Sequence, residues 1–325
     1  MTKEYVLITG ATGFIGSHVT EKLLTDESYC IVAIVRRKKN YKNVEELKNK
    51  GAILAEGDFY DINFVEKIFK EFQIKHVIHI AALRGGGAGT KDDYFKVNVM
   101  GTETLLKASF RNEVKRFIFC SSVGVFGTIP SELPANVNTR LNGDNAYHRS
   151  KILGEEKVQE FIKKGLNAYI VRPTITYGIG DNGFPKQLVR LVRGKMLLLP
   201  KKEVRIHWVS VEKLAELFVL LTKQERLRER VILGLDKNSI TLSCLVDQIY
   251  QHFKNTSYSR YLKIPVLFFV LGVQIGKLFR NEKWVTRFKL ISNDWYYQSD
   301  GFEKEINFRP AITKIEFDKY LKSVE

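Results

Sequence analysis

Residues 9–16 of the chain read TGATGFIG, which places Gly10, Gly13 and Gly16 three positions apart. The apolar run at 5–9 predicts a strand before them, and apolar positions at helical spacing follow over 13–24. In such a unit the first glycine permits a tight turn and the second lets the backbone approach a pyrophosphate. The third lets the helix pack close to the strand. The stretch therefore predicts dinucleotide binding, although an ordinary strand–helix turn is the alternative.

Short apolar runs alternate with helical patterns beyond this stretch. Strands are predicted at 30–35, 52–55, 76–80, 116–120 and 168–172, and helices at 61–72, 92–110 and 147–163. Apolar strands separated by helices are typical of a parallel sheet covered on both faces. We expect an α/β fold, a Rossmann-type doubly wound parallel sheet with a smaller C-terminal substrate lobe. The dinucleotide-binding domain is predicted at 1–178, with 206–235 returning to it, and the lobe at 179–205 and 236–325.

The composition limits the classes of partner. The net charge of the 325 residues is +16, which favours phosphorylated ligands, nucleic acid or anionic membranes. The sequence shows no zinc-finger spacing, no aromatic RNA-binding signature and no long basic tail. Nucleic acid is therefore not expected as a partner. The three cysteines are far apart, which argues against a metal site and a disulfide scaffold. With no visible secretory signal, a cytoplasmic protein is predicted.

Further motifs follow the glycine loop in a fixed order. They are EGDFYD (56–61), HIAA (79–82), VNVMGT (97–102), CSSVGVFG (120–127), YHRSK (147–151) and VRPTITYG (171–178). In these motifs the chain resembles the extended short-chain dehydrogenase/reductase family, the NAD(P)-dependent epimerase/dehydratase type. The segment 293–310 is similar to the tail of sterol-dehydrogenase-like and dihydroflavonol-reductase-like members. The motifs cover more than half of the chain.

The resemblance implies a set of cofactor contacts, in which Asp58 meets the adenine and Pro173 shapes the backbone against the nicotinamide amide. The full set is Gly10, Thr12, Gly13, Phe14, Ile15, Gly16, Arg36, Asp58, Phe59, Ala81, Ala82, Tyr147, Lys151 and Pro173. Arg36 stands twenty residues after Gly16, where an arginine can pair with a 2′-phosphate, and three more basic residues follow it. NADP(H) is therefore favoured, with NAD(H) left open. A solvated basic loop is the alternative.

The catalytic candidates are Ser122, Tyr147, Lys151 and Asn98. Tyr147 and Lys151 are four positions apart, so one helix face presents both. A free tyrosine has a pKa of about 10, which a nearby ammonium and an oxidised nicotinamide would lower toward neutrality. The resemblance implies that Ser122 bonds the substrate oxygen and that Lys151 holds the nicotinamide ribose. Asn98 is expected to hold active-site backbone or a water.

These features predict an NAD(P)-dependent oxidoreductase that interconverts a secondary alcohol and a ketone with a Ser–Tyr–Lys proton relay. Residues that mark sugar-nucleotide members of the family are replaced at 174–176 and at Ser210 and Lys213, so an apolar substrate is expected. The alternative enzyme is a nucleotide-sugar epimerase or reductase. A non-catalytic NAD(P)-sensing protein is the alternative from another class, although it would not need the Ser–Tyr–Lys relay.

Residues 264–279 read IPVLFFVLGVQIGKLF, with Gln274 and Lys277 as their only strongly polar members. The run is shorter than the ~20 apolar residues that span a bilayer. Seven basic residues and one acidic residue lie between 260 and 289. We expect a lobe helix that covers the substrate cleft, with peripheral membrane contact through 260–289 as a secondary prediction. A homodimer is also left open.

Overall fold

The computed structural model describes residues 3–36, 41–85, 89–258 and 262–324. Seven parallel strands form the central sheet, in the order β11-β6-β5-β4-β1-β2-β3. They are β1 (Glu4–Thr9), β2 (Tyr29–Val35), β3 (Ile53–Glu56), β4 (His76–His79), β5 (Arg116–Cys120), β6 (Ala168–Pro173) and β11 (Val231–Gly234). The chain order reverses between β1 and β4. The predicted doubly wound Rossmann sheet is confirmed.

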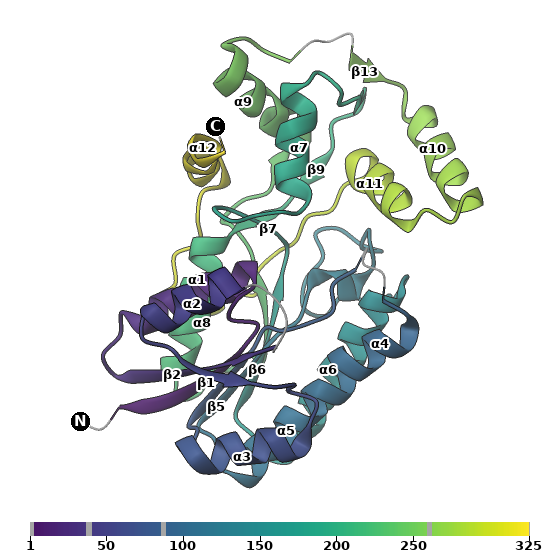
Figure 1. Ribbon diagram of the computed structural model, residues 1–325. Coiled ribbons are helices and arrows are strands. Elements are labelled where there is room, and N and C mark those ends of the chain that lie inside the picture. The colour runs from purple at the N-terminus through teal and green to yellow at the C-terminus, as the bar shows by residue number, and fades with distance from the viewer. Residues whose placement is uncertain (1–2, 37–40, 86–88, 259–261, 325) are drawn as a thin grey trace.

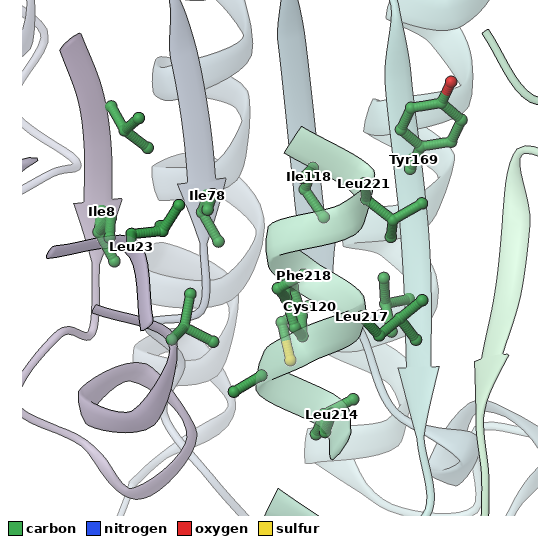
Figure 2. Packing of buried hydrophobic residues seen from close by; sticks show 14 of the residues in the cluster. Ile8, Leu23, Ile78, Ile118, Cys120, Tyr169, Leu214, Leu217, Phe218 and Leu221 are labelled. Carbon is green, nitrogen blue, oxygen red and sulfur yellow. The ribbon is translucent and has the colours of Figure 1, made fainter. Parts of the chain in front are cut away.

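Helices cover both faces of this sheet (Figure 1). On one face lie α3 (Ile62–Phe72), α5 (Gly101–Arg111) and α6 (Ala146–Lys163). On the other lie α1 (Phe14–Leu24), α2 (Tyr41–Asn49) and α8 (Val211–Lys223). Figure 2 shows α8 laying Leu214, Leu217, Phe218 and Leu221 over the strands. Because both faces are covered, the strands are apolar almost throughout, as the sequence pattern predicted.

The helix predicted at 92–110 is not continuous. It consists of α4 (Lys91–Phe95), a π-helical turn at Lys96–Met100 and then α5. Asn98 lies in the π-helical turn and is buried. Such turns inside α-helices are frequent at functional sites, and apolar periodicity alone does not reveal them.

The lobe is built from helices and three short strand pairs. The helices are α7 (Phe184–Arg193), α9 (Leu242–Lys254), α10 (Val266–Leu278), α11 (Glu282–Ser292) and α12 (Thr313–Ser323). The strand pairs join β7 (Ile175–Tyr177) to β10 (Trp208–Ser210), β9 (Arg205–Ile206) to β12 (Ile240–Thr241), and β8 (Leu199–Pro200) to β13 (Lys263–Ile264). Buried rings of Tyr177, Trp208, Phe317 and Tyr320 pack at its centre.

The chain crosses between the sheet and the lobe more often than one boundary would allow. Part of 206–235 supplies α8 and β11 to the sheet. Phe302, Ile306 and Phe308, which were assigned to the lobe from the sequence, instead pack in the core cluster beside the sheet. The domain boundaries themselves stay a prediction.

Candidate active site

The sequence-predicted site residues gather along one edge of the sheet. Because all seven strands are parallel, the loops after their carboxyl ends share that edge, where open α/β sheets bind ligands. The glycine loop follows β1, Arg36 follows β2 and Ala81 and Ala82 follow β4. Ser122 follows β5, and Pro173 ends β6.

The glycine loop has no space for side chains. Gly10 has φ +77°, and a Cβ on it would lie 2.7 Å from the backbone nitrogen of Ala81. A Cβ on Gly16 would lie 2.0 Å from the carbonyl oxygen of Gly10, and one on Gly13 would lie 3.1 Å from the same oxygen. Gly16 therefore lets α1 pack against the loop itself rather than against β1.

The first turn of α1 is left without a side-chain cap. Gly13 stands at the N-cap and makes no side-chain hydrogen bond. The backbone N–H groups of Phe14, Ile15 and Gly16 then face the loop end of the helix, where the helix dipole favours an anion. Thr12 belongs to the same loop, and its carbonyl accepts a hydrogen bond from Asn43. These residues fit the pyrophosphate of a dinucleotide.

A chain of buried hydrogen bonds joins this loop to the π-helical turn. The Thr102 hydroxyl donates to the Asn98 carbonyl at 2.7 Å, so it can only accept from His79 Nε2 at 3.0 Å. His79 Nδ1 then lacks a proton and accepts from the Thr9 hydroxyl at 2.6 Å. The Thr9 oxygen in turn accepts from the Ala81 N–H at 3.2 Å. Burial lowers the pKa of His79 to about 3, which keeps the imidazole neutral and this direction of donors intact.

Asn98 fixes the backbone beyond Ala82. Its side-chain oxygen accepts from the Leu83 N–H at 2.7 Å, and its amide nitrogen donates to the Leu83 carbonyl at 2.9 Å. The same nitrogen contacts the Ser150 hydroxyl at 2.8 Å. Every polar atom of this side chain therefore has a protein partner, and we interpret Asn98 as a positioning group.

Ser122 and Tyr147 come together from β5 and α6. The Ser122 hydroxyl accepts from the Gly124 N–H at 3.0 Å at the start of the 3-10 turn Val123–Phe126. Burial raises the pKa of Tyr147 to about 12, while the hydrogen bond with Ser122 and the charge of Arg84 act in the opposite direction. Arg84 was not singled out from the sequence, although it belongs to the glycine-rich segment after β4.

The predicted lowering of the pKa of Tyr147 refers to the complex with an oxidised nicotinamide and stays a prediction. Lys151 is buried, and its Nζ donates to the Cys120 carbonyl at 2.6 Å and lies 4.1 Å from the centre of the Phe119 ring. Burial lowers the pKa of this ammonium to about 8. Since burial dominates at the phenol, its pKa lies above rather than below the ordinary value of tyrosine.

A buried ion pair behind these side chains was missed in the sequence. Arg172 and Glu155 are both buried, and the guanidinium donates to both carboxylate oxygens, with Nη2–Oε2 at 2.6 Å and Nε–Oε1 at 2.9 Å. The Ser121 hydroxyl donates to the same carboxylate. This network joins β5, β6 and α6. Its sequence signals were Glu155 four positions after Lys151 and Arg172 immediately before Pro173.

The part of the site that is predicted to bind adenine follows the carboxyl ends of β2 and β3. Burial and a hydrogen bond with Asp58 raise the pKa of Tyr60, while the charge of the exposed Arg36 acts in the opposite direction. These three side chains are therefore neighbours. Phe59 is buried and packs on His79, with ring centres 5.2 Å apart, so its side chain belongs to the core. The basic residues at 37–39 lie outside the described residues.

Known proteins resemble this chain in sequence and in fold. The model of the NAD dependent epimerase/dehydratase family matches residues 6–234. The UDP-glucose 4-epimerase of Homo sapiens is 31% identical over 212 residues, which make up 58% of this chain and 60% of that protein. The chain thus spans about three fifths of the length of this curated relative.

Two solved structures show the same fold over nearly the whole chain. The Bordetella bronchiseptica enzyme WbmH, in complex with NAD+, aligns with a TM-score of 0.77 at 18% identity, over 99% of this chain and 98% of that chain. The UDP-glucose 4-epimerase of Thermotoga maritima, with UDP-glucose, gives a TM-score of 0.74 at 20% identity and 98% coverage of both chains. Since the family model matches well over half of the residues, this chain belongs to the NAD dependent epimerase/dehydratase family, within the extended short-chain dehydrogenases/reductases.

Proposed function

We propose that this chain is an NAD(H)-dependent enzyme that inverts a secondary hydroxyl of a nucleotide sugar by oxidising and then reducing the same carbon. The observation that carries this proposal is the meeting of Ser122 and Tyr147 at the sheet edge that also holds the glycine loop. The relatives named UDP-glucose 4-epimerase support the nucleotide-sugar class. This substrate was the alternative from the sequence, where an apolar alcohol was preferred.

The proposed roles follow from the chemistry of the side chains. Tyr147 takes the proton of the substrate hydroxyl and returns a proton to the same oxygen when the carbon is reduced again. Ser122 donates a hydrogen bond to that oxygen. When bound, the dinucleotide supplies the acceptor and then the donor of the hydride. Because burial raises the pKa of Tyr147 to about 12, the phenolate would depend on the hydrogen bond from Ser122, the charge of Arg84 and, when bound, the oxidised nicotinamide.

The choice between NAD(H) and NADP(H) is predicted to depend on Arg36. The family description supports NAD(H) as the cofactor class. The preference for NADP(H) rests on one exposed arginine after β2, and no comparison supports it. It stays an untested alternative to the NAD(H) proposed above, and binding measurements with both dinucleotides decide between them.

An apolar substrate is the second candidate, favoured by the replaced sugar-nucleotide markers at 174–176 and at Ser210 and Lys213. Its other support was a helix expected over the cleft. In the structure α10 lies at the outer edge of the lobe (Figure 1), where Phe269, Gly272 and Gly276 pack against side chains of α11. That support is weaker than the sequence suggested.

One assay separates the candidate functions. The purified chain is incubated with NAD+ and single UDP-hexoses, and products are identified by NMR while absorbance of the reduced cofactor is followed. The proposal expects a second epimer to accumulate with no stoichiometric change in the reduced cofactor. An alcohol dehydrogenase would instead produce reduced cofactor in proportion to an apolar alcohol consumed. Tight cofactor binding with no product from either class would leave the sensor hypothesis.

A further inference from the structure

Two helices at the outer edge of the lobe form a hairpin, α10 and α11 (Figure 1). Their contact is close because glycines on α10 face side chains of α11. A Cβ on Gly272 would lie 2.6 Å from the Phe288 ring, and one on Gly276 would lie 2.9 Å from Val285. The buried ring of Phe269 packs on Phe288 with centres 6.0 Å apart. This inner face of α10 is therefore occupied.

The rest of α10 is apolar and exposed. Leu278 and Phe279, where the hairpin turns, are 79% and 75% exposed, and Leu267 near the start of α10 is 63% exposed. The outer apolar patch, as we call it, consists of Leu267, Phe268, Val270, Leu271, Ile275, Leu278, Phe279 and Trp284. Soluble proteins rarely expose a contiguous apolar surface of this kind unless it binds something.

The charges around the outer apolar patch are almost all positive. From 266 to 292 there are five basic residues and one acidic residue, Glu282. Arg287 contacts Gln187, and Lys289 lies 3.9 Å from Asp144. Lys277, Arg280 and Lys283 have no carboxylate partner among the residues that the structure describes. These three unpaired cations sit at the hairpin turn beside the most exposed apolar side chains.

The combination of apolar side chains and cations indicates which partner the outer apolar patch binds. A second copy of the chain would bring the same cations against these, and the net charge of +16 adds to that repulsion. Nucleic acid would pair the cations and leave the apolar side chains in water. A bilayer that contains anionic lipids satisfies both, since the acyl boundary covers the apolar groups while the headgroups pair with the cations.

We propose that the α10–α11 hairpin is a docking surface for an anionic lipid bilayer. In the part of the chain that the structure describes, no helix combines the length and apolarity needed to cross a membrane. The 13 residues of α10 measure about 20 Å along the helix axis, against a hydrocarbon core of about 30 Å. The helix therefore lies in the interface, with Lys277, Arg280 and Lys283 at the level of the headgroups.

Tryptophan fluorescence tests this location directly. Of the three tryptophans, Trp284 is 44% exposed on the hairpin, whereas Trp208 and Trp295 are buried. Addition of phosphatidylcholine vesicles containing phosphatidylglycerol should shift the emission to the blue, and bromine-labelled acyl chains should quench it. The shift should vanish in Trp284→Phe while that variant still sediments with the vesicles. Sedimentation without any change at Trp284 would place the bound surface elsewhere and overturn the proposal.

Charge reversal supplies the matched test. Each cation near an anionic leaflet contributes about five-fold in binding, so Lys277→Glu/Arg280→Glu/Lys283→Glu should weaken vesicle binding by roughly a hundred-fold or more. The control is Lys314→Glu/Lys319→Glu/Lys322→Glu on α12, which changes the net charge equally and should retain most of the binding. Equal losses in the two variants, or a wild-type chain that ignores anionic vesicles at low salt, would overturn the proposal.

Truncation of apolar groups distinguishes docking on a membrane from association with a second copy of the chain. Leu267→Ser/Phe268→Ser should weaken vesicle binding and abolish the blue shift, whereas Ile315→Ser on α12, where the isoleucine is 54% exposed, should not. If the double variant instead converts a wild-type oligomer to a monomer and binds vesicles as before, the hairpin is a self-association surface and the proposal fails.

Discussion

At the carboxyl edge of the sheet, Lys151, Glu155 and Arg172 are buried and each has a hydrogen-bond partner within the chain. At the α10–α11 hairpin, Lys277 and Arg280 are exposed and face no carboxylate among the described residues. A buried charge must be paired because its removal from water is costly in free energy. An exposed cation stays hydrated, so it needs no partner within the chain and can bind one from solution. The first arrangement fixes a geometry for chemistry, and the second leaves a surface open for binding.

The first way to break this comparison is Tyr147→Phe. If the buried edge performs proton transfer, loss of the phenolic O–H should lower kcat by about 10²–10⁴, while calorimetry still shows dinucleotide binding. The same variant should bind vesicles like the wild type, since Tyr147 lies outside the hairpin. Near-normal epimerisation by Tyr147→Phe would remove the proposed mechanism.

The second prediction concerns the buried ion pair of Arg172 and Glu155 behind the site. Arg172→Met leaves the Glu155 carboxylate buried without its partner, so the free energy of unfolding should fall by about 3–5 kcal/mol. Chemical denaturation measures this loss. The control is Arg172→Met/Glu155→Met, in which no charge is stranded and much of the stability should return. A single variant as stable as the wild type would show that the pair contributes nothing to holding β5, β6 and α6 together.

The difference between the two regions also explains what the sequence could predict. The glycine loop, Ser122 and the Tyr147–Lys151 pair are local patterns at strand or helix ends, so their place at the sheet edge follows from a parallel sheet. The Glu155–Arg172 pair joins residues 17 positions apart on different elements, and only the folded chain shows that they meet. The raised pKa of Tyr147 in the free chain comes from burial, which depends on packing that no spacing reveals.

The segment 264–279 also shows that the sequence does not reveal contacts between separate elements. Its apolar run was correctly expected to form a helix, α10. Which face of that helix is covered depends on Gly272 and Gly276 meeting α11, and the sequence does not state that contact. The prediction that it covers the substrate cleft assumed that an apolar helix is buried, whereas most of its large side chains are exposed.

Arg36 extends the comparison, because it is an exposed cation at the same edge where Lys151, Glu155 and Arg172 are buried. If it pairs with a 2′-phosphate, Arg36→Ala should weaken NADP(H) binding by about ten-fold and leave NAD(H) nearly unchanged. Calorimetric titration of both dinucleotides measures the two changes. Should the wild type prefer NAD(H), as the family description suggests, or should both affinities fall equally, the expected role of Arg36 is wrong.

The smallest expected effect is on folding, at the hairpin. Leu278 is 79% exposed, so Leu278→Glu removes little buried apolar area and should change the free energy of unfolding by no more than about 0.5 kcal/mol. Phe269 is 3% exposed and packs on Phe288, so Phe269→Ala on the same helix should cost about 3–5 kcal/mol, or less if the hairpin unfolds locally. Denaturation of the two variants beside the wild type makes the measurement. A large loss in Leu278→Glu would mean that this side chain is covered in the free protein, in which case it would not be available to dock on a membrane.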